Sequence, residues 1–207
     1  MLTVLPFSTA GATLSQNQGV VLDSSLLVPF VDPECKPYEF TQALAFANDA
    51  TRADALMAMT MKTREELEMT IMRVIAGRTP EIRKFNLAND PTIGKKLFLS
   101  FDAMNSFLID NFSFWPEPLG KTDPETLQRA EELVLNEAVE LPDALIVAQA
   151  EKEGFSIIAS MDGDYLRIKG ANLTIYVPDY IYRKHRNGSM ASSTAGTGAV
   201  PDTSGQA

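Results

Sequence analysis

Three short segments rich in branched apolar residues recur along this chain, and long helical patterns separate them. The segments run from Val20 to Val28, from Phe155 to Ser160 and from Leu173 to Pro178. Buried parallel strands read as continuous apolar runs, and helical crossovers usually connect them. The alternation therefore predicts an α/β fold whose central parallel sheet is covered by helices on both faces.

The stretches between these strands carry signals for helices. Apolar residues recur at helical spacing between Phe40 and Leu56. Asp123 directly precedes Pro124, which is a strong helix start, and Pro142 opens a further helix. We expect most of the chain outside the strands to be helical.

The chain divides into a body and two terminal segments. Residues 1–18 are expected to form an N-terminal extension, and residues 19–186 a domain with an enlarged helical middle region from Arg78 to Lys121. From Asn187 the sequence is small and polar, which predicts a flexible tail over residues 187–207. The N-terminus has no basic residues ahead of its apolar patch, so the cytoplasm is the expected location. We expect no membrane contact, since no apolar stretch reaches the roughly 20 residues that a bilayer requires.

Composition limits the chemistry that this chain can perform. Cys35 is its only cysteine and His185 its only histidine, which excludes an intrachain disulfide and a zinc cluster of cysteine and histidine. The formal net charge of -9 argues against a general nucleic-acid-binding surface, because such a surface presents Lys and Arg to phosphates. Carboxylates that hold a hard divalent metal remain the available machinery for hydrolysis.

Acidic residues stand at the positions where parallel sheets collect ligand sites. Asp23 lies towards the end of the first strand, Asp143 in the first turn of a helix, and Asp162 and Asp164 directly after the second strand. Glu66 lies on an early helix. Converging carboxylates repel each other unless a cation lies between them, so the pattern predicts a site for Mg²⁺ or Mn²⁺.

Each of these acids also has a simpler structural explanation. Asp143 could serve only the dipole of its helix, and Asp162 and Asp164 could be ordinary turn residues. Thr63 could cap its helix with Glu66 as the capping-box partner. In that case the functional acid would be one of two neighbours, Glu65 or Glu68.

Taken together, these residues resemble the motifs of the PIN-domain nucleases. "VVLDSSLLV" resembles the first strand of that family, which ends in Asp followed by Ser or Thr, and "TREELEMTI" resembles the helix that bears an acidic residue before Leu, here Glu66. "LPDALIVAQAEKEGFSIIASMDGDYLRI" is similar to the third and fourth acidic motifs, with Asp143 opening a helix and Asp162 behind Ser160. The resemblance implies a three-layer α/β/α fold and metal-dependent cleavage of RNA or single-stranded nucleic acid.

The resemblance also assigns roles to residues. It implies that four acids are catalytic and bind Mg²⁺ or Mn²⁺, with Asp164 as a further ligand: Asp23, Glu66, Asp143 and Asp162. Hydroxyl groups would orient a carboxylate or a water, and the candidates are Ser24, Ser25 and Ser160. Phosphate contacts are expected from Arg183, Lys184 and Arg186, whereas the other basic residues, Lys62 among them, are expected on a solvated surface.

Toxin-type PIN ribonucleases are the commonest small members of that family. An antitoxin-like protein partner and a homodimer therefore remain open alternatives. The region from Arg78 to Lys121 departs from the compact toxins, because it is longer than the corresponding part of theirs.

Two other classes of function are compatible with part of the pattern. The acidic surface and the enlarged middle region favour an interaction or scaffold protein with weak or lost nuclease activity. A phosphatase or phosphoacceptor domain with Asp23 as its covalent site lacks support, because "DSS" supplies no second Asp two residues on.

Overall fold

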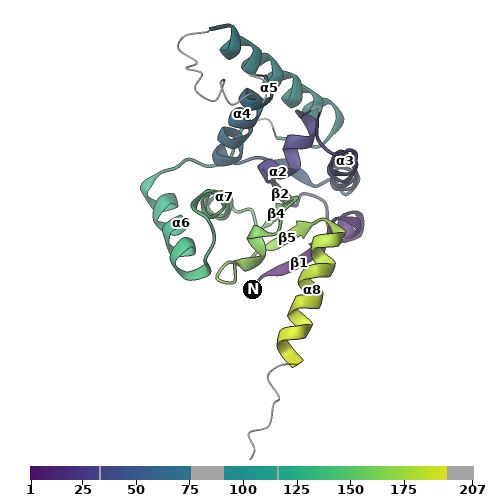
Figure 1. Ribbon diagram of the computed structural model, residues 1–207, viewed down its shortest axis with the longest axis vertical. Helices are drawn as coiled ribbons and strands as arrows, with labels where there is room; N and C mark the ends of the chain where they lie inside the picture. Colours follow the sequence, from purple (N-terminus) through teal and green to yellow (C-terminus); the bar gives the residue numbers. More distant parts are fainter. Residues whose placement is uncertain (33, 76–90, 116, 195–207) are drawn as a thin grey trace, which may run out of the picture.

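The computed structural model describes residues 1–32, 34–75, 91–115 and 117–194 (Figure 1). Five strands of this described part form one sheet in the order β1-β5-β4-β2-β3, and every pairing is parallel. The strands are β1 (Thr3–Pro6), β2 (Gly19–Leu22), β3 (Leu56–Ala58), β4 (Ile157–Ala159) and β5 (Thr174–Val177).

Helices connect and cover these strands. The α-helices are α1 (Ala10–Thr13), α2 (Ser24–Leu27), α3 (Pro37–Arg52), α4 (Met61–Ile75), α5 (Pro91–Asn111), α6 (Pro124–Glu137), α7 (Leu141–Lys152) and α8 (Asp179–Thr194). Short 3-10 helices are η1 (Phe7–Thr9), η2 (Val28–Phe30) and η5 (Asp164–Arg167). No helix in the described ranges has both the length and the apolar character that crossing a bilayer demands.

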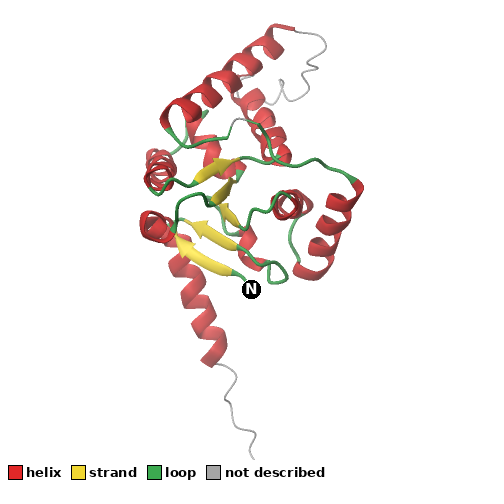
Figure 2. Ribbon diagram, turned by 180° about the vertical axis from the view of Figure 1, so that it is seen from behind, coloured by secondary structure: helices red, strands yellow, loops and turns green. Residues whose placement is uncertain are grey.

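Side chains of β1, β2, β4 and β5 alternate between two separate hydrophobic clusters, one on each face of the sheet. Val20 and Leu22 of β2 belong to the cluster that contains residues of α3, α4 and α5, whereas Val21 belongs to the cluster with α6 and α7. Figure 2 shows the sheet between these two groups of helices. The predicted α/β fold with a parallel sheet covered on both faces is therefore confirmed.

Two element boundaries differ from the sequence-based expectation. The expected strand from Val20 to Val28 ends at Leu22, because Asp23 caps the short helix α2 that follows. The helical pattern expected to continue to Leu56 ends at Arg52, and Leu56 begins β3. β3 forms because its backbone pairs with β2, which is a contact that local periodicity does not reveal.

Both terminal segments contain ordered elements. Residues 3–6, within the expected N-terminal extension, pair with β5 as the edge strand β1. The flexible tail was expected from Asn187, but α8 continues to Thr194. The rest of that tail, and residues 78–90 of the expected middle region, lie outside the described residues.

The strand order places a topological switch point between β2 and β4. From β2 the chain proceeds to β3 on one side, and it later returns to β4 on the other side. Leu22 pairs with Ala159, so Asp23 and Ser160 leave the sheet next to each other at the carboxyl ends of their strands. Crevices at such points are where open α/β sheets bind ligands.

Candidate functional site

Asp23 lies at this switch point as a buried carboxylate with many hydrogen-bond donors. Its side chain is 3% exposed, and its backbone N–H donates to the carbonyl of Ala159 at 2.9 Å. Oδ2 accepts hydrogen bonds from the Ser25 N–H at 3.3 Å, from the Ser25 hydroxyl, and from the Ser160 hydroxyl at 3.0 Å. Oδ1 accepts one from the Tyr165 hydroxyl at 2.9 Å. These donors offset the cost of burying the charge.

The same serines join the loops that follow β2 and β4. The Ser25 hydroxyl accepts a hydrogen bond from the Met161 N–H at 2.9 Å, and the Ser160 hydroxyl accepts one from the Asp162 N–H at 3.1 Å. The backbone that carries Asp162 is therefore fixed relative to Asp23.

Glu66 lies on the first turns of α4 and faces the same region. The Ser24 hydroxyl donates to its Oε2 at 2.7 Å, so each of the three suggested serines contacts a carboxylate. The helix begins at Met61 with Thr60 as its capping residue, because the Thr63 N–H donates to the Thr60 hydroxyl at 3.1 Å. The expected capping by Thr63 is therefore wrong, which leaves Glu66 free of the capping-box role.

The two neighbours of Glu66 point elsewhere. Glu65 is 59% exposed at its side chain and lies 3.8 Å from Lys62, and Glu68 pairs with Arg64 at 2.9 Å. Of the three glutamates, Glu66 is the one whose charge acts on Asp143. The geometry therefore favours Glu66 as the second acid.

Asp143 stands in the first turn of α7 and is partly buried. Within the described residues, no group donates a hydrogen bond to its carboxylate and no cation pairs with it. Burial, and then the charges of Asp23, Asp162, Asp164 and Glu66 in that order, together raise the pKa of Asp143 to about 7. Four carboxylates from three other parts of the chain therefore lie within electrostatic reach of Asp143.

Asp162 lies in the loop between β4 and η5, and Asp164 is the first residue of η5. Oδ1 of Asp162 accepts a hydrogen bond from the Asp164 N–H at 3.1 Å, so Asp162 does stabilise a turn. Burial and the charge of Asp23 nevertheless raise the pKa of Asp162 to about 6, which shows that it also faces the buried acid. Asp164 is exposed and lies 3.8 Å from Arg167.

The donor set suits a hard divalent cation in its chemistry, because it consists of carboxylate oxygens that repel one another. No three Asp, Glu, His or Cys side chains of the described ranges are close enough to enclose a metal ion together. The carboxylates lie at one rim of the sheet. Because no three of them are close enough to enclose an ion, their side chains would have to move closer to bind one.

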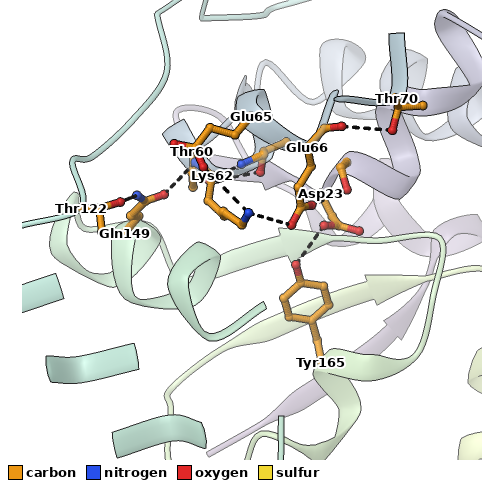
Figure 3. A network of polar contacts seen from close by, with 11 residues as sticks. Asp23, Thr60, Lys62, Glu65, Glu66, Thr70, Thr122, Gln149 and Tyr165 are labelled. Atoms are coloured by element: carbon orange, nitrogen blue, oxygen red, sulfur yellow. Dashed lines mark hydrogen bonds and ion pairs between the residues drawn. The ribbon is translucent and has the colours of Figure 1, made fainter. Parts of the chain in front are cut away.

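Three further residues adjoin these acids and were not expected there. Lys62 was expected on a solvated surface, yet its Nζ lies 3.6 Å from Oε1 of Glu66 with only 21% of the side chain exposed (Figure 3). The i, i+4 spacing from Lys62 to Glu66 was the signal that could have identified it. Gln149 and Tyr165 are fully buried polar residues, and the sequence carries no comparable signal for either of them.

The basic residues expected to contact phosphate lie apart from the acids. Arg183, Lys184 and Arg186 are exposed on α8. This helix follows β5 and extends away from the end of the molecule where α4 and α5 lie (Figure 1). No described ion pair joins them to the acidic rim.

Comparisons with known proteins complete this description. No protein-family model matches the sequence, and no curated protein matches it. Among solved structures, one similar chain comes from a member of the VapBC family of toxin-antitoxin systems, VapBC-5, from Mycobacterium tuberculosis. The match covers 77% of this chain and 98% of that chain, with 18% identity and a TM-score of 0.42. At this level of similarity the functional argument rests on the residues of the chain itself.

Proposed function

We propose that this protein is a metal-dependent nuclease that cleaves phosphodiester bonds of RNA or single-stranded nucleic acid. The observation that carries the proposal is Asp143, a partly buried carboxylate that has no partner among the described residues and lies near other acids at the switch point of a parallel sheet. A protein gains no stability from such a group, and perturbed acids of this kind concentrate at functional sites. A divalent cation would compensate the charge.

In this proposal Asp23, Glu66, Asp143 and Asp162 hold one or two Mg²⁺ or Mn²⁺ ions, and Asp164 assists as a further ligand. When bound, such an ion polarises a phosphodiester oxygen and lowers the pKa of a water, which is the chemistry that hydrolysis requires. Ser25 and Ser160 keep Asp23 in one orientation through their hydrogen bonds to Oδ2, and Ser24 does the same for Glu66.

The substrate part of the proposal relies on charge. A formal net charge of -9 disfavours nonspecific binding of nucleic acid over the whole surface. Arg183, Lys184 and Arg186 form a local basic cluster on an exposed helix face, and single strands bind such clusters through phosphates. The motif resemblance to toxin-type PIN ribonucleases extends the proposal to an antitoxin-like protein partner and to a homodimer.

A cleavage assay with a matched pair of variants tests this function. Purified protein is incubated with single- and double-stranded RNA and DNA, in Mn²⁺ or in a chelator. We expect cleavage of single-stranded RNA in Mn²⁺ only. The activity of Asp143→Asn should be at least about 100-fold lower, since stabilisation of the charge that develops in the transition state is worth several kcal/mol.

Asp110→Asn is the matched control, because Asp110 is an exposed carboxylate on α5. It should cleave like the wild-type protein. Full activity of Asp143→Asn, or equal cleavage in the chelator, would contradict the proposed chemistry.

One observation supports a second candidate. The absence of a ready-made group of three metal ligands in the described residues fits an interaction or scaffold protein that has lost nuclease activity. A wild-type protein that folds but neither binds Mn²⁺ nor cleaves any of the four nucleic acids would favour this candidate.

A further inference from the structure

Tyr165 is a buried polar side chain next to the acidic rim. It lies in η5, directly after the loop that carries Asp162 and Asp164, and its side chain is 0% exposed. Its ring packs in the cluster that contains residues of α6, α7 and β5. In Figure 3 the Tyr165 hydroxyl points towards Asp23.

The hydroxyl of Tyr165 donates to Oδ1 of Asp23 at 2.9 Å, across 142 residues of sequence. Burial and then the charge of Asp23 raise the pKa of Tyr165 well above its ordinary value, so the phenol keeps its proton at neutral pH. A hydrogen bond from a neutral donor to a carboxylate is stronger than one between neutral groups, and burial strengthens it further.

The two oxygens of Asp23 differ in how many donors they receive. Oδ2 accepts from the Ser25 N–H and from the hydroxyls of Ser25 and Ser160, which leaves it no room for a further partner. Oδ1 accepts from Tyr165 only, in the described part of the chain. Because a carboxylate oxygen offers about two lone-pair directions, Oδ1 is the oxygen that can still receive a cation.

We propose that Tyr165 is a positioning residue, which directs the free lone pair of Asp23 Oδ1 towards the other carboxylates. This inference rests on the proposed function, since it concerns how one ligand of that site is oriented. Phe at this position would fill the same space in the core but would remove the one described contact to Oδ1, so that only the contacts to Oδ2 orient the Asp23 carboxylate. Outer partners of this kind typically change metal affinity or activity by about 10–100-fold.

A second buried tyrosine supplies the control that distinguishes a positioning role of Tyr165 from a role in core stability alone. Tyr176 is 1% exposed, lies on the opposite face of the sheet and shares a hydrogen bond of 2.6 Å with the Thr13 hydroxyl. Tyr176→Phe therefore removes one buried phenol hydroxyl that contacts Thr13, whereas Tyr165→Phe removes one that contacts Asp23.

Both variants and the wild-type protein are titrated with Mn²⁺ and assayed on a single-stranded RNA. We expect Tyr165→Phe to bind Mn²⁺ about 10-fold more weakly and to lower kcat about 10–100-fold with KM nearly unchanged. Tyr176→Phe should match the wild type in both, and the melting temperatures of the two variants should be similar.

Two outcomes would overturn the inference, and they are distinguishable. If the wild type binds Mn²⁺ and cleaves RNA, but Tyr165→Phe matches Tyr176→Phe in affinity and kcat, Tyr165 has only a structural role. If the folded wild type neither binds Mn²⁺ nor cleaves, the proposed function fails and the inference fails with it.

Discussion

At the scale of single residues, Asp143 makes stability depend on pH in an unusual direction. Its pKa is about 7 in the folded protein against 3.8 for an ordinary Asp, so the folded chain holds a proton that the unfolded chain has already lost. Between about pH 4 and pH 7 the free energy of unfolding therefore falls as the pH rises. Asp162, with its pKa of about 6, acts in the same direction.

We predict that Asp143→Asn stabilises the protein at pH 8 without metal and has little effect at pH 4. The full shift corresponds to a ceiling of about 4 kcal/mol, and solvent around this partly exposed group reduces the expected gain to about 1–2 kcal/mol. Urea unfolding in a chelator at both pH values measures it. Loss of stability at pH 8 in the Asn variant would show that the Asp143 charge is not repelled by its neighbours.

The sequence indicated which acids stand at the junctions of strands and helices, but not which groups contact them. Asp23, Asp143 and Asp162 could be predicted because each follows a strand or opens a helix, and those junctions are visible in a linear pattern. The hydrogen bond from Tyr165 to Asp23 could not, because it joins residues 142 positions apart and local sequence does not indicate which buried hydroxyl will meet which carboxylate. Lys62 was misplaced on the solvated surface because its exposure depends on how α4 packs.

At the scale of elements, Gln149 links α7 to the start of α4. It is fully buried, its Oε1 accepts from the Lys62 N–H at 3.1 Å, and its Nε2 donates to the Thr122 hydroxyl at 3.2 Å (Figure 3). An N–H in the first turn of a helix has no partner within that helix. Gln149 therefore helps to hold Glu66 on α4 near Asp143 on α7.

We predict that Gln149→Leu costs about 1–3 kcal/mol of stability, because it leaves the Lys62 N–H without this acceptor. Mn²⁺ binding should weaken as well, since Glu66 is then held less firmly. Urea unfolding and a Mn²⁺ titration measure the two effects.

Thr122→Val is the control, because it removes only the second contact of Gln149 at an exposed position. It should change both quantities much less. Equal effects of the two substitutions would mean that the link between α7 and α4 does not position the acids.

Local sequence predicted some helices and strands better than others. α6 could be predicted in detail, because Asp123 caps it by accepting from the Thr126 N–H at 2.9 Å and Pro124 fits its first turn. β1 and β3 were missed because they form by pairing with strands that are distant in the sequence, and no apolar β-branched run like those of β4 and β5 marks them. Short strands owe their existence to such pairing more than to propensity.

At the scale of the whole molecule, the topology brings the acids together. β2 and β4 are neighbours in the sheet although well over 100 residues separate Leu22 from Ala159, and helices on both faces fix the rim where their carboxyl ends meet. Residues that follow β2 and β4 can therefore contribute to one site although they are far apart in the sequence. The alternation of strands and helices was enough to predict this arrangement in outline, whereas the distances between the carboxylates depended on packing that only the folded chain contains.

Calorimetric titration of the wild-type protein with Mn²⁺ at pH 7, in buffers of different ionisation enthalpy, tests the central claim most directly. We predict binding that releases about half a proton, because Asp143 with a pKa of about 7 must ionise to take part. Asp143→Asn should abolish that release and most of the binding. An absence of Mn²⁺ binding in the wild type, or the same affinity and proton release in Asp143→Asn, would contradict a metal site at this rim.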